Sequence, residues 1–159
     1  MPTIVLASAL VINALMAGLY FGFSTSVMPG LARTDPRSYV TAMQRIDESI
    51  ENPRFLAAFT GALVLPIVAV FLHFGSDGGG RLPWIVLGAV LYGATVVITG
   101  AVNLPLNRRL RTAGAVTDQN APAIRAAYHD RWTRFNTART ALCTAAVIAL
   151  TVALAQPLA

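Results

Sequence analysis

Five residues in the last third of the chain recur at the spacing of one helix face. Arg125, His129, Trp132, Asn136 and Arg139 are separated by steps of four, three, four and three positions, so a helix would line them up in one stripe. They offer two guanidinium groups, an imidazole, an indole N–H and an amide. Such a set can bind a polar aromatic molecule, move a proton and stabilise a developing oxyanion. We therefore expect the chemistry of this protein along this stripe.

Two residues are candidates for a general base. His129 carries the side chain that titrates closest to neutral pH, although a lone histidine on a helix is more often simply solvated. Asp47 is the second candidate, and it can act only if its own helix faces the same pocket. Arg125 and His129 lie further from the following apolar run than the other stripe residues do. The inner part of the stripe therefore carries the main prediction.

Arg139 stands where a long apolar run begins, and two asparagines leave the preceding apolar run at a similar depth. A charge at that point is costly unless it reaches the lipid headgroups or finds partners. Asn103 and Asn107 flank Pro105, and they form either a helix end with its turn or a pair of amides that face a cavity. Buried polar groups need hydrogen-bond partners. Three amides, an indole and a guanidinium at one level predict a pocket for a polar aromatic ligand.

Long uncharged runs dominate the rest of the 159 residues. Apolar residues make up 55% and charged residues 12% of the sequence, against about 45–50% and about 25% in soluble domains. A helix of about 20 residues crosses a hydrocarbon core, and four runs meet this length: 4–27, 55–74, 83–102 and 140–158. We predict a single all-α domain, a four-helix transmembrane bundle. The first run lacks the basic start of a cleaved signal, and Met28-Pro29-Gly30 should end its helix.

The segment between the first two runs has the pattern of an amphipathic helix. Asp35-Pro36 is a suitable start, because a capping side chain precedes proline at the first turn. Apolar residues then recur at steps of four, three and four, namely Tyr39, Met43, Ile46 and Ile50. This helix should lie at the cytoplasmic membrane surface or cover the bundle. On its polar flank, Gln44 and Asp47 are candidate substrate-binding residues, with solvation as the default expectation.

Positive charge is distributed unevenly over the connections. All twelve basic residues are arginine, and eleven lie between the first and second runs or between the third and fourth, with only Arg81 elsewhere. The positive-inside rule places segments 28–54 and 103–139 in the cytoplasm and both termini outside, in a bacterial-type plasma membrane. The last helix should begin in the cytoplasm near Asn120 and continue into the membrane. This asymmetry accounts for the net charge of +5, so nucleic-acid binding is not needed to explain it.

The sequence carries no metal or nucleotide signature. His73 and His129 are predicted at opposite faces of the membrane, so they cannot share a metal or a haem. The single cysteine, Cys143, excludes a cysteine-only metal site. No glycine motif follows a strand in the way that dinucleotide binding requires. We expect neither a metal nor another cofactor.

Three blocks make the chain resemble a known family. MQRIDESIENP at residues 43–53, NLPLN at 103–107 and WTRFNTART at 132–140 are similar to blocks in the small membrane proteins of the anthrone oxygenase family. The order of the blocks and the four spans are also the same. Two positions depart from the expected pattern. Asp47 stands where we expect asparagine in the family, and Phe135 stands where we expect tryptophan.

The resemblance implies oxidation of an anthrone, or of another electron-rich polycyclic aromatic, by O₂ without metal or flavin. The partners would be a small apolar aromatic substrate, O₂ and the lipid bilayer. Trp132 would stack on the substrate or donate a hydrogen bond to it. The remaining polar residues would orient the substrate and stabilise oxyanion charge: Asn103, Asn107, Asn136 and Arg139.

Two other functions fit the same residues. A non-enzymatic membrane protein would use the pocket to bind a lipid, a quinone or a partner subunit. A small transporter subunit is less favoured, because no acidic residue lies in a predicted membrane core as a proton relay would need. Assembly into a homo-oligomer is left open by the sequence.

Overall fold

The computed structural model describes residues 1–75 and 80–157, and every regular element among them is helical. In chain order the elements are α1 (Pro2–Gly22), the π-helical segment η1 (Phe23–Val27), α2 (Met28–Ala32), α3 (Pro36–Ile50), α4 (Pro53–His73), α5 (Arg81–Ile98), the π-helical segment η2 (Thr99–Asn103), α6 (Leu104–Arg111) and α7 (Ala121–Ala155). The predicted all-α class is therefore confirmed.

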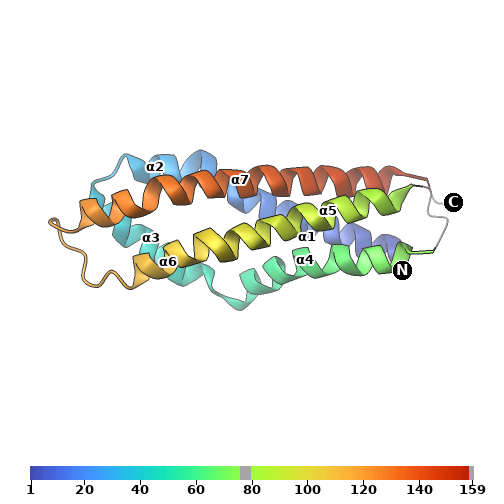
Figure 1. Cartoon of the computed structure of the whole chain (residues 1–159), viewed down its shortest axis with the longest axis horizontal. Coiled ribbons are helices and arrows are strands. Elements are labelled where there is room, and N and C mark those ends of the chain that lie inside the picture. The colour runs from blue at the N-terminus through green and yellow to red at the C-terminus, as the bar shows by residue number, and fades with distance from the viewer. Residues whose placement is uncertain (76–79, 158–159) are drawn as a thin grey trace.

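Four long helical stretches form an elongated bundle (Figure 1), and α3 is the fifth helix. The four are long and apolar enough to cross a membrane: Pro2–Ala32, Pro53–His73, Arg81–Arg111 and Ala121–Ala155. The start of α1 and the end of α7 lie at one end of the bundle, and α2, α3 and α6 lie at the other. At 1.5 Å per residue α7 is about 50 Å long, more than the roughly 30 Å of a hydrocarbon core. It is therefore longer than a crossing of the hydrocarbon core requires.

Pro29 was expected to end its helix, and a helix end was one of two alternatives at Pro105, but neither proline ends a helix. Pro29 stands in the first turn of α2 and Pro105 in the first turn of α6, and each follows a π-helical segment that continues the preceding helix. A proline ring clashes with the carbonyl four residues earlier in an α-helix. The wider π turn moves that carbonyl away, so both long helices continue past the membrane ends predicted for them.

The amphipathic helix α3 begins as the sequence predicts. Asp35 caps it by accepting a hydrogen bond from Ser38 N at 2.9 Å, and Pro36 occupies the first turn. The buried face includes Tyr39 and Met43, but it also includes Asp47. The default expectation of a solvated flank is therefore wrong for Asp47. Its carboxylate points into the bundle, which α3 covers at one end.

Helix packing along the bundle relies on small residues and one buried amide. α5 packs most extensively on α7, where a Cβ on Gly88 would lie only 2.9 Å from the Leu150 side chain. Asn13 Nδ2 donates to Ala62 O at 3.0 Å, which ties α1 to α4. The buried line of α7 here includes Cys143 and Ala146, while Ala141 is exposed.

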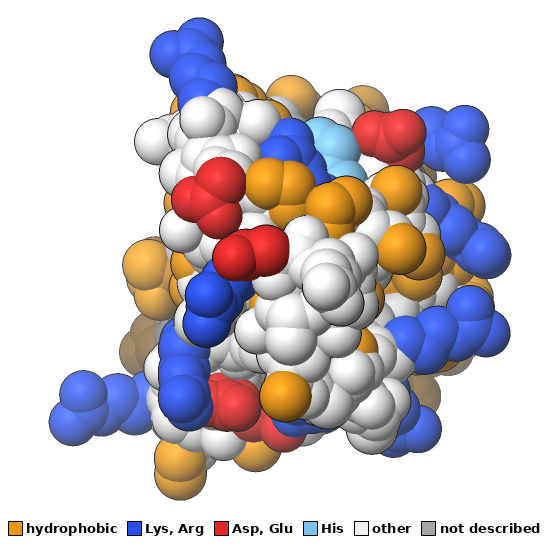
Figure 2. Space-filling view, turned by 90° about the vertical axis from the view of Figure 1, so that its left-hand side faces the viewer, with side chains coloured by type: hydrophobic (Ala, Val, Ile, Leu, Met, Phe, Trp, Pro, Cys, Tyr) orange, Lys and Arg blue, Asp and Glu red, His pale blue; other side chains and the backbone are white. Residues whose placement is uncertain are grey.

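The surface of the bundle has two kinds of regions. Large apolar side chains are exposed along the spans, among them Val11, Leu15, Phe71, Val90 and Ile148, as expected for helices that face lipid. The end that carries α3 and the start of α7 is rich in arginine (Figure 2). The structure thus separates an apolar belt from a basic end.

Candidate active site

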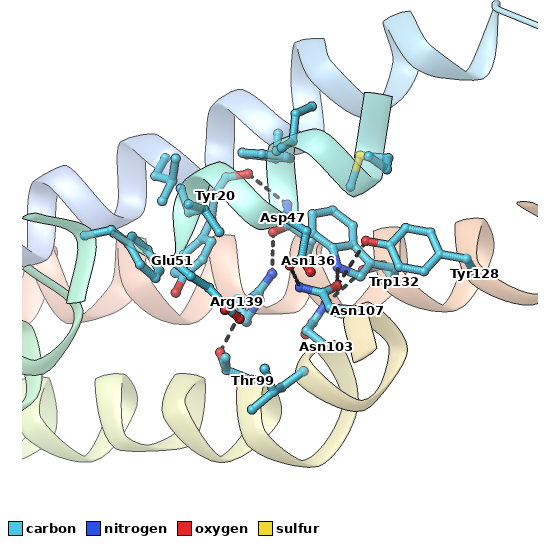
Figure 3. Close-up of a pocket in the computed structure, with 17 residues that line it drawn as sticks. Tyr20, Asp47, Glu51, Thr99, Asn103, Asn107, Tyr128, Trp132, Asn136 and Arg139 are labelled. Atoms are coloured by element: carbon cyan, nitrogen blue, oxygen red, sulfur yellow. Dashed lines mark hydrogen bonds between the residues drawn. The ribbon is translucent and has the colours of Figure 1, made fainter. Parts of the chain in front are cut away.

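A cavity of about 120 Å³ lies inside the bundle, beneath α3 (Figure 3). Residues from α1, η1, α3, α4, η2, α6 and α7 line it, and its wall is mostly apolar. For scale, an engineered protein cavity of about 150 Å³ binds benzene. The cavity therefore takes roughly one aromatic ring as it stands. A polycyclic ligand would have to extend through its opening or displace side chains.

Asn107 is the centre of a hydrogen-bond network at one side of the cavity. Its Oδ1 accepts from Trp132 Nε1 at 2.8 Å and from the Tyr128 hydroxyl at 3.1 Å. Its Nδ2 donates to Asp47 Oδ1. Two donors on one oxygen fix which way the amide points, so the NH₂ group must face the carboxylate. The network joins α3, α6 and α7 and holds the Trp132 ring against the cavity.

Asp47 is a buried carboxylate whose partners offset only part of the cost of burying its charge. Its residue is 4% exposed. Arg111 Nε lies 3.1 Å from Asp47 Oδ2, while Arg111 Nη1 lies 2.8 Å from Glu51. The ion pair with Arg111 does not have hydrogen-bond geometry, so Oδ2 accepts no hydrogen bond from the protein. Burial raises the pKa of Asp47 above its ordinary value, and the charge of Arg111 offsets only part of this shift. Such a carboxylate is a stronger base than a solvated one.

Arg139 is a buried cation whose partners are all neutral. It is 5% exposed, and it donates to Asn136 Oδ1 at 2.8 Å and to Thr99 Oγ1 at 3.2 Å. Its guanidinium lies 4.4 Å from the ring centre of Tyr20 and 5.6 Å from that of Trp132. Among the described residues no carboxylate lies within 4.0 Å of it. The alternative of a headgroup-seeking arginine does not fit this buried position.

Asn136 holds Arg139 in place and links two helices. Its Nδ2 donates to Tyr20 O at 2.9 Å and to Ser24 Oγ at 2.8 Å. With both amide hydrogens used, its Oδ1 is oriented toward Arg139. The guanidinium is therefore positioned by α1 and α7 together before any ligand arrives.

Most of the predicted site residues meet at this cavity. The residues among them that line it are Asp47, Asn103, Asn107, Trp132, Asn136 and Arg139. For Asn103 and Asn107, the interpretation as amides that face a cavity is therefore the one the structure supports. Asn103 is 1% exposed, and its Nδ2 donates to Trp132 O at 3.4 Å.

Three predicted residues do not line the cavity. His129 Nδ1 lies 3.1 Å from the Tyr39 hydroxyl, in a separate surface hollow. Gln44 Nε2 donates to Leu110 O at 2.9 Å, which fastens α3 to α6. Arg125 donates to the backbone oxygens of Ala32 and Thr34, next to the end of α2. These side chains hold the basic end of the bundle together.

Four site residues were not predicted: Tyr20, Thr99, Arg111 and Tyr128. Tyr128 stands four positions before Trp132 on the same helix face, so the stripe could have been extended to it. Tyr20 stands seven positions after Asn13, on the same face of an otherwise apolar helix. Arg111 carried no such signal, because its partners Asp47 and Glu51 lie on α3 and directly after it.

Metal binding finds no support in the part of the chain that the structure describes. No group of three or more His, Cys, Asp or Glu side chains there could hold a metal ion. His73 ends α4 near the termini, while His129 belongs to the opposite end of the bundle. The two histidines therefore lie toward opposite ends of the bundle.

The fold and the cavity together define a class: small all-α proteins with four candidate membrane spans and a polar-lined internal pocket. The family model described as anthrone oxygenase matches residues 54–149, and the chain belongs to this family. No curated protein and no solved structure matches the chain. The matched segment contains Asn103, Asn107, Trp132, Asn136 and Arg139, while Tyr20 and Asp47 precede it.

Proposed function

We propose that this protein is a membrane-embedded, cofactor-independent oxygenase that oxidises an anthrone-like polycyclic aromatic with O₂. One observation carries the proposal: a single cavity is lined by a buried carboxylate, Asp47, and by a buried arginine, Arg139, that has no acidic partner among the described residues. The first can take a proton from the substrate, and the second can stabilise the anion that results. The apolar wall suits a flat aromatic ring. Family membership supports the same reaction class.

The proposed reaction begins with a proton transfer. Asp47 removes one proton from the acidic methylene of the anthrone, and the electron pair of that C–H bond moves into the ring system. The carbonyl oxygen becomes an enolate oxyanion, whose charge Arg139 stabilises. This carbanion-like enolate is electron-rich enough to pass one electron to O₂, which is the oxidant.

The remaining steps form and break the oxygen bonds. Superoxide and the substrate radical combine at the former methylene carbon, which creates a C–O bond and a peroxide anion. Asp47 returns its proton to that peroxide. Loss of water then removes the second hydrogen of the carbon together with the outer oxygen, and the inner oxygen remains as the new carbonyl. One O₂ therefore converts one anthrone to one quinone and one water.

The choice of Asp47 as the base follows from placement. His129, the first candidate from the sequence, does not line the cavity, whereas Asp47 does. Because Asp47 departs from the asparagine expected in the family, the assignment is made for this chain and not for the family as a whole. Trp132 would pack on the substrate, and Asn103 and Asn107 would orient it.

We also propose an orientation in the membrane. The basic end, with α3 and the start of α7, would face the cytoplasm, and both termini would lie outside. Eleven of the twelve arginines belong to the segments at the basic end, as the positive-inside rule requires of cytoplasmic connections. The membrane would be a bacterial-type plasma membrane, from which an apolar substrate could reach the cavity.

The test is O₂ consumption by the purified protein with anthrone, with the spontaneous oxidation of anthrone subtracted. Asp47→Asn should lower kcat by about a hundredfold or more, as loss of a general base does. Asp118→Asn, at a surface carboxylate that is 83% exposed, is the matched control and should keep full activity. Full activity of a folded Asp47→Asn protein would remove Asp47 from the mechanism. Binding of the quinone without any O₂ uptake by the wild type would instead support the binding-protein alternative.

A further inference from the structure

Unsatisfied polar atoms are concentrated at the cavity. Among the described residues, seven buried side-chain nitrogen or oxygen atoms have no hydrogen-bond partner in the protein. Four of the seven belong to residues that line the cavity: Tyr20 Oη, Asp47 Oδ2, Asn103 Oδ1 and Arg139 Nε. Buried polar groups are nearly always hydrogen-bonded, because an unpaired one costs free energy. Asp47 Oδ2 also forms an ion pair with Arg111 Nε at 3.1 Å, and the other three atoms indicate the hydrogen-bond pattern of a ligand.

The four atoms divide into two donors and two acceptors. Tyr20 Oη and Arg139 Nε can donate, and the guanidinium lies over the Tyr20 ring at 4.4 Å. Asn103 Oδ1 is an acceptor only. Asp47 Oδ2 is also an acceptor only, as long as the carboxyl group is ionised. The acceptor residues are connected through α6, because Asp47 binds Asn107 and Asn107 follows Asn103 by one helical turn. In Figure 3, Tyr20 and Arg139 lie to one side of Asn103 and Asn107.

The other atoms of these residues are already used within the protein. Arg139 uses one hydrogen of Nη1 for Thr99 and one of Nη2 for Asn136, whereas its Nε makes no hydrogen bond. Tyr20 is 4% exposed. Thr99 and Arg139 are near its hydroxyl, but neither makes a hydrogen bond of good geometry with it. Both donors without a partner therefore belong to residues that line the cavity.

We propose that Tyr20 and Arg139 form an oxyanion site for a carbonyl or phenolate oxygen of the ligand, opposite acceptors on Asp47 and Asn103 that receive its proton-donating groups. This inference rests on the proposed function and extends it. It adds Tyr20 as a catalytic residue, because its hydroxyl touches the oxygen on which charge develops.

The test uses 1,8-dihydroxyanthraquinone, whose visible absorption moves to longer wavelength when a phenol ionises. The wild-type protein should bind it and lower the pH at which the bound phenol ionises. Tyr20→Phe should weaken binding of the ionised form about three- to tenfold, the usual effect of one neutral hydrogen bond. Arg139→Gln should weaken it more, because a charged donor is lost.

Tyr92→Phe is the matched control. The Tyr92 hydroxyl is also buried, but it donates to Phe59 O at 3.0 Å, and Tyr92 does not line the cavity. This variant should bind and ionise the dye as the wild type does. Circular dichroism of each variant in the same detergent shows that the helices are formed. Arg139→Lys, which keeps a charge but lacks Nε, should recover only part of the ionisation shift.

The outcomes separate this inference from the proposed function. Dye ionisation that is shifted in the wild type and less shifted in Tyr20→Phe supports the oxyanion site, even if no O₂ is consumed with anthrone. Unchanged ionisation and unchanged kcat in a folded Tyr20→Phe protein would overturn the site, even if the wild type is an active oxygenase. No ionisation shift in the wild type would overturn the oxyanion site as well, because Tyr20 Oη and Arg139 Nε would then not stabilise a ligand oxyanion.

Discussion

The indole N–H of Trp132 donates a hydrogen bond of 2.8 Å to Asn107 Oδ1, across the gap between α7 and α6. Since that oxygen also accepts from Tyr128, the amide nitrogen of Asn107 is left to face Asp47. The position of one aromatic ring therefore controls the hydrogen bond that the candidate base receives. This coupling leads to a first prediction.

Replacing Asn107 by aspartate should move the pH dependence of activity. Burial already raises the pKa of Asp47, and Asp47 must be ionised to act as a base, so activity should fall as the pH drops through that pKa. Asn107→Asp removes a donor and adds a second negative charge, which raises the pKa of the carboxylate pair further. The acid limb of the kcat profile should move to higher pH. Asn120→Asp, at a residue that does not line the cavity, should leave the profile in place.

The same pH profile can also contradict the assignment of Asp47 as the titrating base. If the acid limb stays where it is in a folded Asn107→Asp protein, the group that titrates is not Asp47. A shift to lower pH would exclude direct charge coupling between residues 47 and 107.

Removing the Asp47 charge should not cost stability at neutral pH. A carboxylate whose pKa is raised by burial binds its proton more tightly in the folded state than in the unfolded state. Raising the pH through the window between the two pKa values therefore lowers the free energy of unfolding of the wild type. Asp47→Asn should melt at the same temperature as the wild type or higher at pH 7, and the difference should shrink toward pH 4. A large loss of stability at pH 7 would mean that the Arg111 ion pair outweighs desolvation.

His129 should be dispensable for the reaction. It contacts Tyr39 outside the cavity, so His129→Gln should change kcat less than about threefold, within the effect of one lost neutral hydrogen bond. Steady-state O₂ uptake with anthrone measures this directly. A loss as large as that of Asp47→Asn would return His129 to the position of general base.

The contact between α5 and α7 should be sensitive to a single methyl group. A Cβ on Gly88 would lie 2.9 Å from the fully buried Leu150 side chain, and overpacking costs about 1–3 kcal/mol. Gly88→Ala should therefore lower the thermal midpoint of the purified protein. Gly93→Ala, where a Cβ would meet nothing within 4 Å, should not lower it. Equal stability of the two variants would show that Leu150 moves aside freely.

Much of the bundle can be predicted from the sequence, because the spans are set by length and hydropathy alone. The inner stripe residues Trp132, Asn136 and Arg139 were predicted by the 3.6-residue period, and all three line the cavity. The helix ends were less predictable. Pro29 and Pro105 usually signal an end, but the preceding π turns depend on packing around η1 and η2 that no local rule describes.

The base and its partners show why the rest could not be predicted. Asp47 has the spacing of a solvated flank, and it is buried because Asn107 and Arg111, some 60 positions later, lie beneath α3. Tyr20 belongs to an apolar helix whose pattern fixes a span but not which tyrosine meets Arg139. Such pairings depend on how the helices pack against one another, and the hydrophobic period of a single helix does not predict that packing.

The central claim is that O₂ itself reacts with the substrate in this cavity, and isotopically labelled O₂ tests it most directly. The purified wild-type protein should convert anthrone to quinone faster than the spontaneous reaction, with one labelled oxygen in the new carbonyl and the other in water. Asp47→Asn should show only the spontaneous rate. Quinone formed at the enzymatic rate without labelled oxygen would contradict the mechanism. No rate above the spontaneous one would contradict the proposed function.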